Sequence, residues 1–283
     1  MKNISIISIA IIALLSSCKK DLDLDLNTEE NQRLVVDALF STYAQEHVVK
    51  LNMTANYYSA DSPEKISGAS VSISDGANVT SFIETSPGIY KSSANATASF
   101  SKEHTLTIDY NGKTYTAKNY CDTVPVLDTV IAELYTGPGA FGPGNGPPGE
   151  APTGLQYDIK FSTQELIGFG DSYAWKIYVN GVLRNDSISE QLSNNDEYLP
   201  DGTYFNEVSL TIMDDLNSGD TIVVAQHAIS EETYDAYIAI LYQTQYKGGI
   251  FDAPPANVPT NLSEGAVGLF SVTGEVRAYT VIP

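Results

Sequence analysis

The chain has 283 residues, enough for two domains of ordinary size or for one large β-sandwich with a sizeable core. It carries 15 Lys and Arg residues against 35 Asp and Glu residues, for a net charge of −20. Nucleic-acid binding requires clustered basic side chains that neutralise phosphates, so this composition argues against a nucleic-acid partner.

The N-terminus has the organisation of an export signal. Lys2 precedes an apolar run from Ile4 to Leu15, which is shorter than the roughly 20 apolar residues that a membrane-spanning helix needs. We therefore predict that residues 1–17 are a cleaved signal peptide. The run ends in Leu15-Ser16-Ser17-Cys18, which resembles the bacterial lipobox, in which the cysteine takes a diacylglycerol. The alternative is an ordinary secretory signal beside a chance cysteine, and the sequence favours lipidation of Cys18.

Residues 18–31 are predicted to be a lipidated tether. Two or three acyl chains on one cysteine hold a protein on a membrane essentially permanently, because each buried methylene contributes about 0.8 kcal/mol. Asp21, Asp23 and Asp25 alternate with leucines in a pattern similar to the signal that exports Bacteroidetes lipoproteins to the cell surface. A plain solvated tether would also be acidic. We expect an outer-membrane location, facing the exterior.

Residues 32–122 show short segments with alternating apolar and polar side chains, which is typical of strands with one buried face. Asn111-Gly112 separates two such segments and suits a two-residue turn with positive φ angles. The pattern predicts an immunoglobulin-like or transthyretin-like sandwich. The expected strands are 34–39, 47–53, 69–74, 79–84, 88–91, 104–110 and 113–117.

Residues 123–283 are predicted to form a larger β-rich sandwich-type domain. Pro125 indicates extended chain at its start. A Gly/Pro loop over 136–154 is incompatible with regular structure, and it is either a binding loop that carries Phe141 or a tolerated insertion. Two closing strands are expected after Gly265. The other expected strands are 155–161, 174–179, 204–213 and 221–227. In the second of these, Trp175, Ile177 and Val179 are expected to point inward, and Asn180-Gly181 after it is another tight-turn signal.

One amphipathic helix is predicted near 230–246. Ser230 is a suitable N-cap, and the two glutamates that follow favour the positive end of the helix dipole. Tyr234, Tyr237 and Leu241 share one face at helical spacing. This stripe either packs on a sheet or lines a ligand groove, and packing is the commoner arrangement.

The sequence nominates no catalytic residue, cofactor site or metal site. Lipidation uses Cys18, which leaves Cys121 without a partner for a disulfide and makes it a predicted buried thiol. The histidines at 47, 104 and 227 fall in expected strands; a zinc site at His47 and His104 is the alternative to simple packing. The acidic segment 214–220 lacks the glycine position and the glutamate of an EF-hand, so a solvated turn is favoured.

Several segments in a fixed order resemble a Bacteroidetes family of outer-membrane lipoproteins, the domain of unknown function numbered four-two-four-nine. The resemblance implies an immunoglobulin-like or transthyretin-like first domain, a larger β-rich second domain and genes that are often adjacent to TonB-dependent receptors; it implies no reaction. Besides the lipobox, the segments include Ile66-Ser67-Gly68-Ala69-Ser70-Val71, Asn111-Gly112-Lys113-Thr114-Tyr115, Pro254-Pro255-Ala256-Asn257-Val258 and Gly265-Ala266-Val267-Gly268-Leu269-Phe270.

The expected function is that of a non-enzymatic, lipid-anchored cell-envelope protein. Its predicted role is to bind beside a TonB-dependent outer-membrane transporter in nutrient uptake, with membrane lipid as the partner of acylated Cys18. Two other classes stay open at this point. One is a surface hydrolase of carbohydrate or peptide, since 35 acidic residues make a chance carboxylate pair inevitable. The other is a structural or adhesive surface protein, supported by the immunoglobulin-like pattern alone.

Overall fold

A computed structural model describes residues 32–55, 62–136, 155–168, 170–196, 202–245 and 257–283. The fold is mainly β, with sandwich-like sheets, as the alternation of side chains predicts. Cys18, the tether and almost all of the Gly/Pro loop lie outside the described residues. No helix within these ranges combines the length and the apolar character needed to cross a bilayer.

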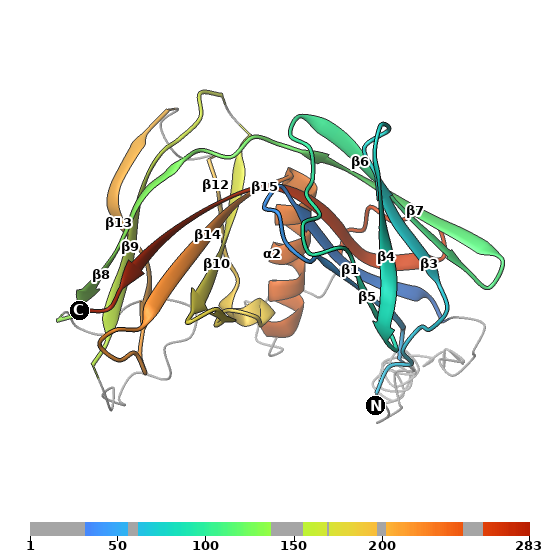
Figure 1. Cartoon of the computed structure of the whole chain (residues 1–283), viewed down its shortest axis with the longest axis horizontal. Coiled ribbons are helices and arrows are strands. Elements are labelled where there is room, and N and C mark those ends of the chain that lie inside the picture. The colour runs from blue at the N-terminus through green and yellow to red at the C-terminus, as the bar shows by residue number, and fades with distance from the viewer. Residues whose placement is uncertain (1–31, 56–61, 137–154, 169, 197–201, 246–256) are drawn as a thin grey trace, which may run out of the picture. The chain divides into compact units, whose positions relative to one another are not determined.

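The first part of the chain contains seven strands, and their paired order is β1-β2-β5-β4-β3-β6-β7 (Figure 1). The hairpin of β6 and β7 turns at Asn111 and Gly112, whose φ angles of 50° and 74° confirm the predicted turn. The bounds are β1 Leu34–Ser41, β2 Val48–Met53, β3 Ser70–Ser74, β4 Val79–Ser86, β5 Ile89–Lys91, β6 Lys102–Tyr110 and β7 Lys113–Cys121.

The second part contains a sheet in the order β13-β9-β8 and a group of strands around β10 and β14 (Figure 1). Strand β8 begins two residues after Pro125, where the sequence analysis predicts extended chain but no strand. Several side chains of β8 are exposed, so its sequence lacks a clear apolar alternation. The bounds are β8 Leu127–Leu134, β9 Tyr157–Gln164, β10 Ser172–Val179, β11 Val182–Leu183, β12 Leu192–Asn195, β13 Tyr204–Met213, β14 Thr221–Ile229 and β15 Ala266–Val281, with a short 3-10 helix η2 at Ile188–Glu190.

The helix α2, Glu231–Gln245, begins after Ser230 as predicted, and the Ser230 hydroxyl accepts a hydrogen bond from the backbone N–H of Thr233 at 3.3 Å. Its buried face differs from the predicted one. Thr233 and Ala236 are fully buried, whereas Tyr234 and Tyr237 are only partly buried. The Thr233 hydroxyl donates to the Ser271 hydroxyl of β15 at 3.2 Å, so this face of the helix contacts the sheet.

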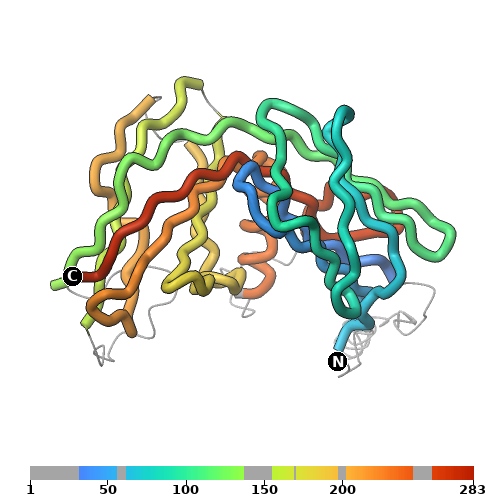
Figure 2. Tube along the Cα trace, in the orientation of Figure 1, coloured from blue at the N-terminus to red at the C-terminus, as the bar shows by residue number. Residues whose placement is uncertain are grey.

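Strand β15 is a correction to the sequence analysis, because the two expected closing strands are one continuous strand of 16 residues. Its first half, Ala266–Thr273, pairs in parallel with β1, and its second half, Gly274–Val281, pairs antiparallel with β14. Figure 2 shows the C-terminal trace running first beside the N-terminal strand and then beside β14. The change of partner at Gly274 makes one strand look like two in the sequence.

Two hydrophobic cores lie on either side of this change of partner. The N-terminal core gathers side chains of strands β1 to β7 and of the first half of β15, with Phe40, Tyr90 and Phe270 as its largest fully buried members. The C-terminal core gathers side chains of β8, β9, β10 and β14, including Ile159 and Trp175. Since β15 contributes to one core and borders the other, its backbone has to fit closely at both.

Gly268 allows this close fit. Its φ is +107°, and a Cβ at this position would overlap the backbone of Val36 in β1. We predict that Gly268→Ala lowers the free energy of unfolding by roughly 3 kcal/mol or more, because a strained backbone angle and a clash with rigid main chain act together. Urea unfolding followed by circular dichroism measures the loss.

Gly76→Ala is the matched control. Gly76 also has a positive φ, +86°, but open space surrounds its Cβ position. Only the backbone strain applies there, so the expected loss is about 1 kcal/mol. Equal losses in the two variants would show that the approach of β15 to β1 is not tight in solution.

Candidate functional site

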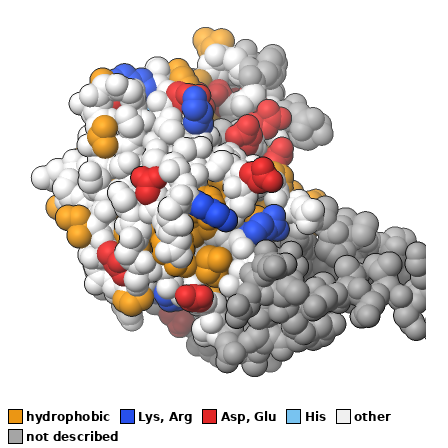
Figure 3. All heavy atoms as spheres, turned by 90° about the vertical axis from the view of Figure 1, so that its right-hand side faces the viewer, with side chains coloured by type: hydrophobic (Ala, Val, Ile, Leu, Met, Phe, Trp, Pro, Cys, Tyr) orange, Lys and Arg blue, Asp and Glu red, His pale blue; other side chains and the backbone are white. Residues whose placement is uncertain are grey.

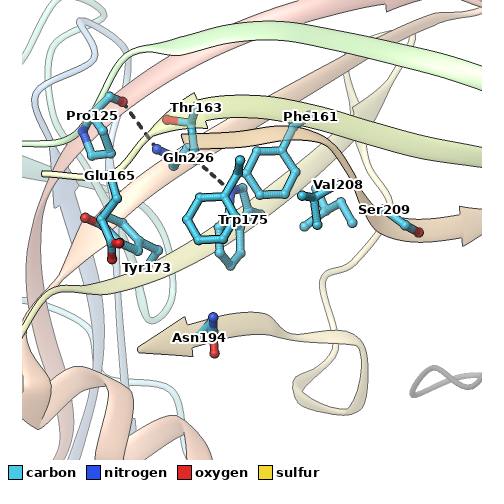
Figure 4. Close-up of a pocket in the computed structure, with 12 residues that line it drawn as sticks. Pro125, Phe161, Thr163, Glu165, Tyr173, Trp175, Asn194, Val208, Ser209 and Gln226 are labelled. Carbon is cyan, nitrogen blue, oxygen red and sulfur yellow. Dashed lines mark hydrogen bonds between the residues drawn. The ribbon is translucent and has the colours of Figure 1, made fainter. Parts of the chain in front are cut away.

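The candidate site is a partly enclosed cavity of about 200 Å³ on the second part of the chain. Strands β9, β10, β12, β13 and β14 line it, together with the segment before β8 (Figure 4). Its lining residues are Pro125, Phe161, Thr163, Glu165, Tyr173, Trp175, Asn194, Phe205, Val208, Ser209, Leu210 and Gln226. We call this cavity the aromatic pocket.

Three aromatic rings form one wall of the pocket. The ring centroids of Phe161 and Trp175 are 5.5 Å apart, and those of Tyr173 and Trp175 are 6.3 Å apart. Tyr173 and Trp175 are two residues apart on β10 and therefore point to the same face of the strand. The sequence analysis predicts that Trp175 points into the core. In the structure, Trp175 is part of the C-terminal core and also lines the cavity.

A chain of hydrogen bonds holds the Trp175 ring in place. Its Nε1–H donates to Oε1 of Gln226 at 3.0 Å, and Nε2 of Gln226 donates to the carbonyl oxygen of Pro125 at 3.2 Å (Figure 4). Both polar side chains are almost completely buried and mutually satisfied. The indole therefore offers a fixed ring face rather than a hydrogen-bond donor.

One end of the pocket is acidic. Glu165 follows β9 directly and is 3% exposed, and Figure 4 shows its carboxyl group beside Tyr173. Burial raises the pKa of the Tyr173 hydroxyl, and the nearby negative charges of Asp171, Glu165 and Asp196 raise it further. Among the residues that the structure describes, no Lys, Arg or His side chain lines the pocket.

Strand β13 forms the opposite end with an irregular backbone. Its pairing with β9 shifts register between Phe205 and Val208 and again between Ser209 and Thr211. Glu207 lies in the first irregularity with a φ of 50°, an uncommon angle for a residue other than glycine, and its N–H donates to the Ser162 hydroxyl at 2.9 Å. Bulges of this kind re-aim side chains next to binding sites.

The serine and threonine hydroxyl groups in the described lining of the pocket are engaged within the protein. The Thr163 hydroxyl donates to the carbonyl oxygen of Val126 at 2.7 Å, and the Ser209 hydroxyl donates to Oδ1 of Asp158 at 2.6 Å. Activation of such a hydroxyl as a nucleophile needs an adjacent general base, most often histidine, and no histidine is among the described residues of the lining.

The residues that carry the pocket, apart from Trp175, escaped the sequence analysis. Phe161 marked the expected end of a strand that in fact continues to Gln164, and Glu165 comes one residue later. The one available signal was the spacing of Tyr173 and Trp175 on a single strand face. The partners of that face come from four other strands, and no local pattern names them.

A second cavity, of about 330 Å³, lies in the first part of the chain and includes Asp75 and His104 in its lining. The Asp75 carboxylate accepts hydrogen bonds from Lys102, Ser99 and the backbone N–H groups of Ala77 and Asn78. These donors, Lys102 first, hold its pKa well below the usual value. Asp75 thus ties a turn to β6 and has a structural role.

The candidate zinc histidines are engaged elsewhere. His47 lies just before β2 rather than in a strand, and its Nε2 is 3.1 Å from the carbonyl oxygen of Ala96. The Nε2 atom of His104 accepts a hydrogen bond from the Ser99 N–H at 3.2 Å. Both rings pack edge-on against Phe40. Across the described ranges, no group of three or more His, Cys, Asp or Glu side chains is placed to hold a metal ion.

Cys121 and the acidic segment 214–220, which the sequence analysis also considered, are both part of the structural framework. Cys121 is a fully buried free thiol, and burial, with a smaller contribution from Asp122, raises its pKa to about 12. In the acidic segment 214–220, the Asp220 carboxylate accepts hydrogen bonds from the Asn217 N–H and from Nδ2 of Asn180, both at 2.8 Å. That carboxylate closes a turn.

His227 belongs to a buried cluster between β14 and β15. Its Nδ1 is 3.0 Å from the Thr273 hydroxyl and 3.9 Å from Oε2 of Glu275, whose other oxygen pairs with Arg277 at 2.6 Å. A catalytic triad uses both ring nitrogens, one toward the nucleophile and one toward the acid. Here a single nitrogen faces both groups, and His227, Thr273 and Glu275 are almost inaccessible, so the cluster is structural.

The His227 cluster makes stability depend on pH. Burial is the main cause that lowers the pKa of His227 from 6.5 to about 4, although Glu275 opposes this shift. A neutral His227 favours the folded state above pH 6.5, and that contribution is lost as the pH falls toward 4. We predict that His227→Gln removes up to about 3 kcal/mol of the fall in unfolding free energy across this window.

Urea unfolding of both proteins at pH 7.0, 5.5 and 4.5 measures this effect. The comparison concerns the slope with pH rather than the absolute stability, so a generally less stable variant still tests it. His47 and His104, whose pKa values burial also lowers, stay in both proteins and supply the remaining slope. Parallel pH profiles would contradict the assignment.

Comparison with models of known protein families identifies the family to which this chain belongs. A family model described as "Domain of unknown function (DUF4249)" matches residues 19–278. The chain belongs to this family. The resemblance to this domain of unknown function is therefore confirmed. The match covers the N-terminal core, the C-terminal core except Ile282, and the described lining of the aromatic pocket.

No curated protein matches this DUF4249 chain. Among solved structures, a match titled "Cytokine receptor complex - Crystal form 1A" is 10% identical and covers 87% of this chain and 94% of that chain, with a TM-score of 0.23. A TM-score this low carries no argument about fold or function.

Proposed function

We propose that this DUF4249 protein is a non-enzymatic, lipid-anchored binding protein of the outer membrane that faces the cell exterior and acts beside a TonB-dependent transporter in nutrient uptake. The aromatic pocket is its ligand site. The observation that carries the proposal is the cavity of about 200 Å³ with a fixed Trp175 face and a buried carboxyl group at one end.

The anchor part of the proposal is supported by the N-terminal sequence. A basic residue, a short apolar run and Leu15-Ser16-Ser17-Cys18 stand in the order of a lipoprotein signal. The family model begins at residue 19, directly after the cysteine. An acylated Cys18 would hold the folded body at the membrane surface through the tether, with no spanning segment required.

The binding part is supported by the concentration of apolar and aromatic side chains around one concave site. Small-molecule sites are concave and mostly apolar, with a few polar groups that fix orientation.

On the face shown in Figure 3, acidic side chains lie among the basic ones and much of the surface is uncharged. The described lysines that pair with carboxylates include Lys50, Lys91, Lys102, Lys118 and Lys160.

The two cysteines provide a matched test of the anchor. We predict that Cys18→Ser moves the protein from the membrane fraction to the soluble fraction and abolishes incorporation of a labelled fatty acid, because the hydroxyl cannot take the lipid thioether. Cys121→Ser is the control, since Cys121 is buried in the N-terminal core. It should stay acylated and membrane-bound. Acylation that persists in Cys18→Ser would refute the anchor.

The transporter part is tested by affinity capture from detergent-solubilised outer membranes. We expect the tagged wild-type protein to bring down a TonB-dependent receptor in comparable amount, identified by mass spectrometry. The unanchored Cys18→Ser protein, captured in the same way, should lose most of the receptor because the tether raises the local concentration of the two partners. Repeated recovery of the lipoprotein alone would rule out a stable transporter complex.

A further inference from the structure

The second cavity, of about 330 Å³, lies in the first part of the chain, and we call it the polar cavity. The turn between β3 and β4, the start of β4 and the segment between β5 and β6 supply most of its lining. Loops that a rigid β scaffold holds in place are common positions for binding residues. The described lining consists of Phe40, Ile73, Asp75, Asn78, Thr80, Ser93, Asn95, Ala96, Thr97, Ser99 and His104.

Hydrogen bonds pin the segment 92–99 to the chain just before β2. The N–H of His47 donates to the Ser92 hydroxyl at 2.9 Å, and the N–H of Ser92 donates back to the carbonyl oxygen of His47 at 3.0 Å. The carbonyl oxygen of Ala96 accepts from the N–H of Gln45 at 3.2 Å and lies 3.1 Å from Nε2 of His47. A segment fixed in this way needs no further ordering when a ligand binds, which lowers the entropic cost of binding.

Asp75 fixes another part of the wall. Its carboxylate accepts from the N–H groups of Ala77 and Asn78 at 2.9 and 2.7 Å, which closes the turn between β3 and β4. It also accepts from the Ser99 hydroxyl at 2.8 Å, which joins this turn to the pinned segment. Lys102 balances its charge at 2.9 Å. The turn and the segment therefore hold one another in position around the cavity.

The buried residues of the lining give the polar cavity an apolar floor. Phe40 and Ile73 are each 2% exposed, and Ala96 is 7% exposed. The ring of His104 packs edge-on against Phe40, and its Nε2 accepts a hydrogen bond from the N–H of Ser99. This floor can contact the C–H groups of a ligand.

The rim of the polar cavity carries amide and hydroxyl side chains. Asn78, Ser93, Asn95 and Thr97 are exposed, and Thr80 is partly buried on β4. Amide and hydroxyl side chains can both donate and accept hydrogen bonds. The hydroxyl groups of a sugar have the same dual capacity, while the C–H groups of its ring form apolar patches. A sugar ring would thus place C–H groups on the floor and hydroxyl groups at the rim.

The size of the cavity suits one sugar ring. A volume of about 330 Å³ equals that of roughly 11 molecules of liquid water, at about 30 Å³ each. Since each water molecule contributes one non-hydrogen atom, this space matches a molecule of the size of a hexose, and a longer saccharide would extend out of it. We propose that the polar cavity binds one neutral hexose ring.

Sugar binding at this cavity goes beyond the proposed function, which concerns the aromatic pocket. The two cavities share no described lining residue and belong to different parts of the chain. Either site can therefore be tested without the other.

Saturation-transfer NMR on the detergent-solubilised full-length protein measures binding. The probes are methyl β-D-glucopyranoside, methyl β-D-galactopyranoside and methyl α-D-mannopyranoside. Cyclohexylmethanol is the matched control molecule, because it keeps a ring of the same size and the hydroxymethyl group but lacks the ring hydroxyl groups. We expect at least one glycoside to bind with saturation and at least about tenfold more tightly than cyclohexylmethanol, because several hydrogen bonds at the rim act together.

Hydrogen–deuterium exchange mass spectrometry locates the site without any substitution. At a saturating concentration of the glycoside, peptides that cover 75–80 and 92–99 should exchange more slowly, because a ligand stabilises the conformation that it contacts. Protection confined to the strands that line the aromatic pocket would overturn the assignment to the polar cavity.

Two substitutions test the rim. Asn95→Ala and Thr80→Val each remove hydrogen-bonding groups from the lining and should weaken binding of the glycoside about threefold to tenfold. Asn206→Ala is the matched control for Asn95→Ala, because Asn206 is also exposed and lies on β13, outside the described lining of the polar cavity. It should leave the affinity for the glycoside unchanged.

Three results overturn sugar binding at the polar cavity. They are the absence of binding by all three glycosides, equal binding of cyclohexylmethanol and the best glycoside, and wild-type affinity in both folded rim variants. If neither rim variant folds, the pattern of exchange protection decides. Failure to capture a transporter would count against the proposed function alone.

Discussion

The pairing of β15 with two different partners is the constraint on which the rest of the structure depends. Its first half joins β1, the first described strand, and its second half joins β14. Contacts between the two ends of a chain carry a large loop-closure cost, which burial of the strand in a core offsets. The backbones can approach only because Gly268 and Gly274 lack a Cβ where Val36 and Asp122 come close. Both cores and the sheet that connects them follow from this fit.

The same strand explains why the most chemically suggestive residues are not a site. Glu275, which is buried, pairs with the partly buried Arg277 on β15. The Arg277 guanidinium lies 3.7 Å from the centre of the Tyr43 ring and donates to Gln45 at 2.9 Å. Burial alone would raise the pKa of Glu275, but its partners in this cluster outweigh burial and hold the pKa below its usual value. Removal of Arg277 would leave the buried Glu275 carboxylate without this partner, which is costly in surroundings of low dielectric.

Strand β14 separates this buried cluster from the aromatic pocket. Neighbouring residues of a strand point to opposite faces, so Gln226 bonds to Trp175 on the pocket side while His227 contacts Thr273 on the other. The polar groups on one side are satisfied and inaccessible, and those on the other side hold an aromatic face at a cavity. One face of β14 thus carries a closed polar cluster, and its other face supports the wall of the cavity that we propose as the ligand site.

Local chemistry determined much of what the sequence could tell by itself. The Asn111-Gly112 and Asn180-Gly181 turns have the positive φ angles that these residue pairs tolerate, the helix begins after Ser230, and Cys121 is buried. Each of these depends on a few adjacent residues. Tertiary structure alone decided that β15 is one strand with two partners and that Glu165 lies beside Tyr173 and Trp175. Alternation along a strand shows which side chains share a face, but it does not identify the distant strand that will cover that face.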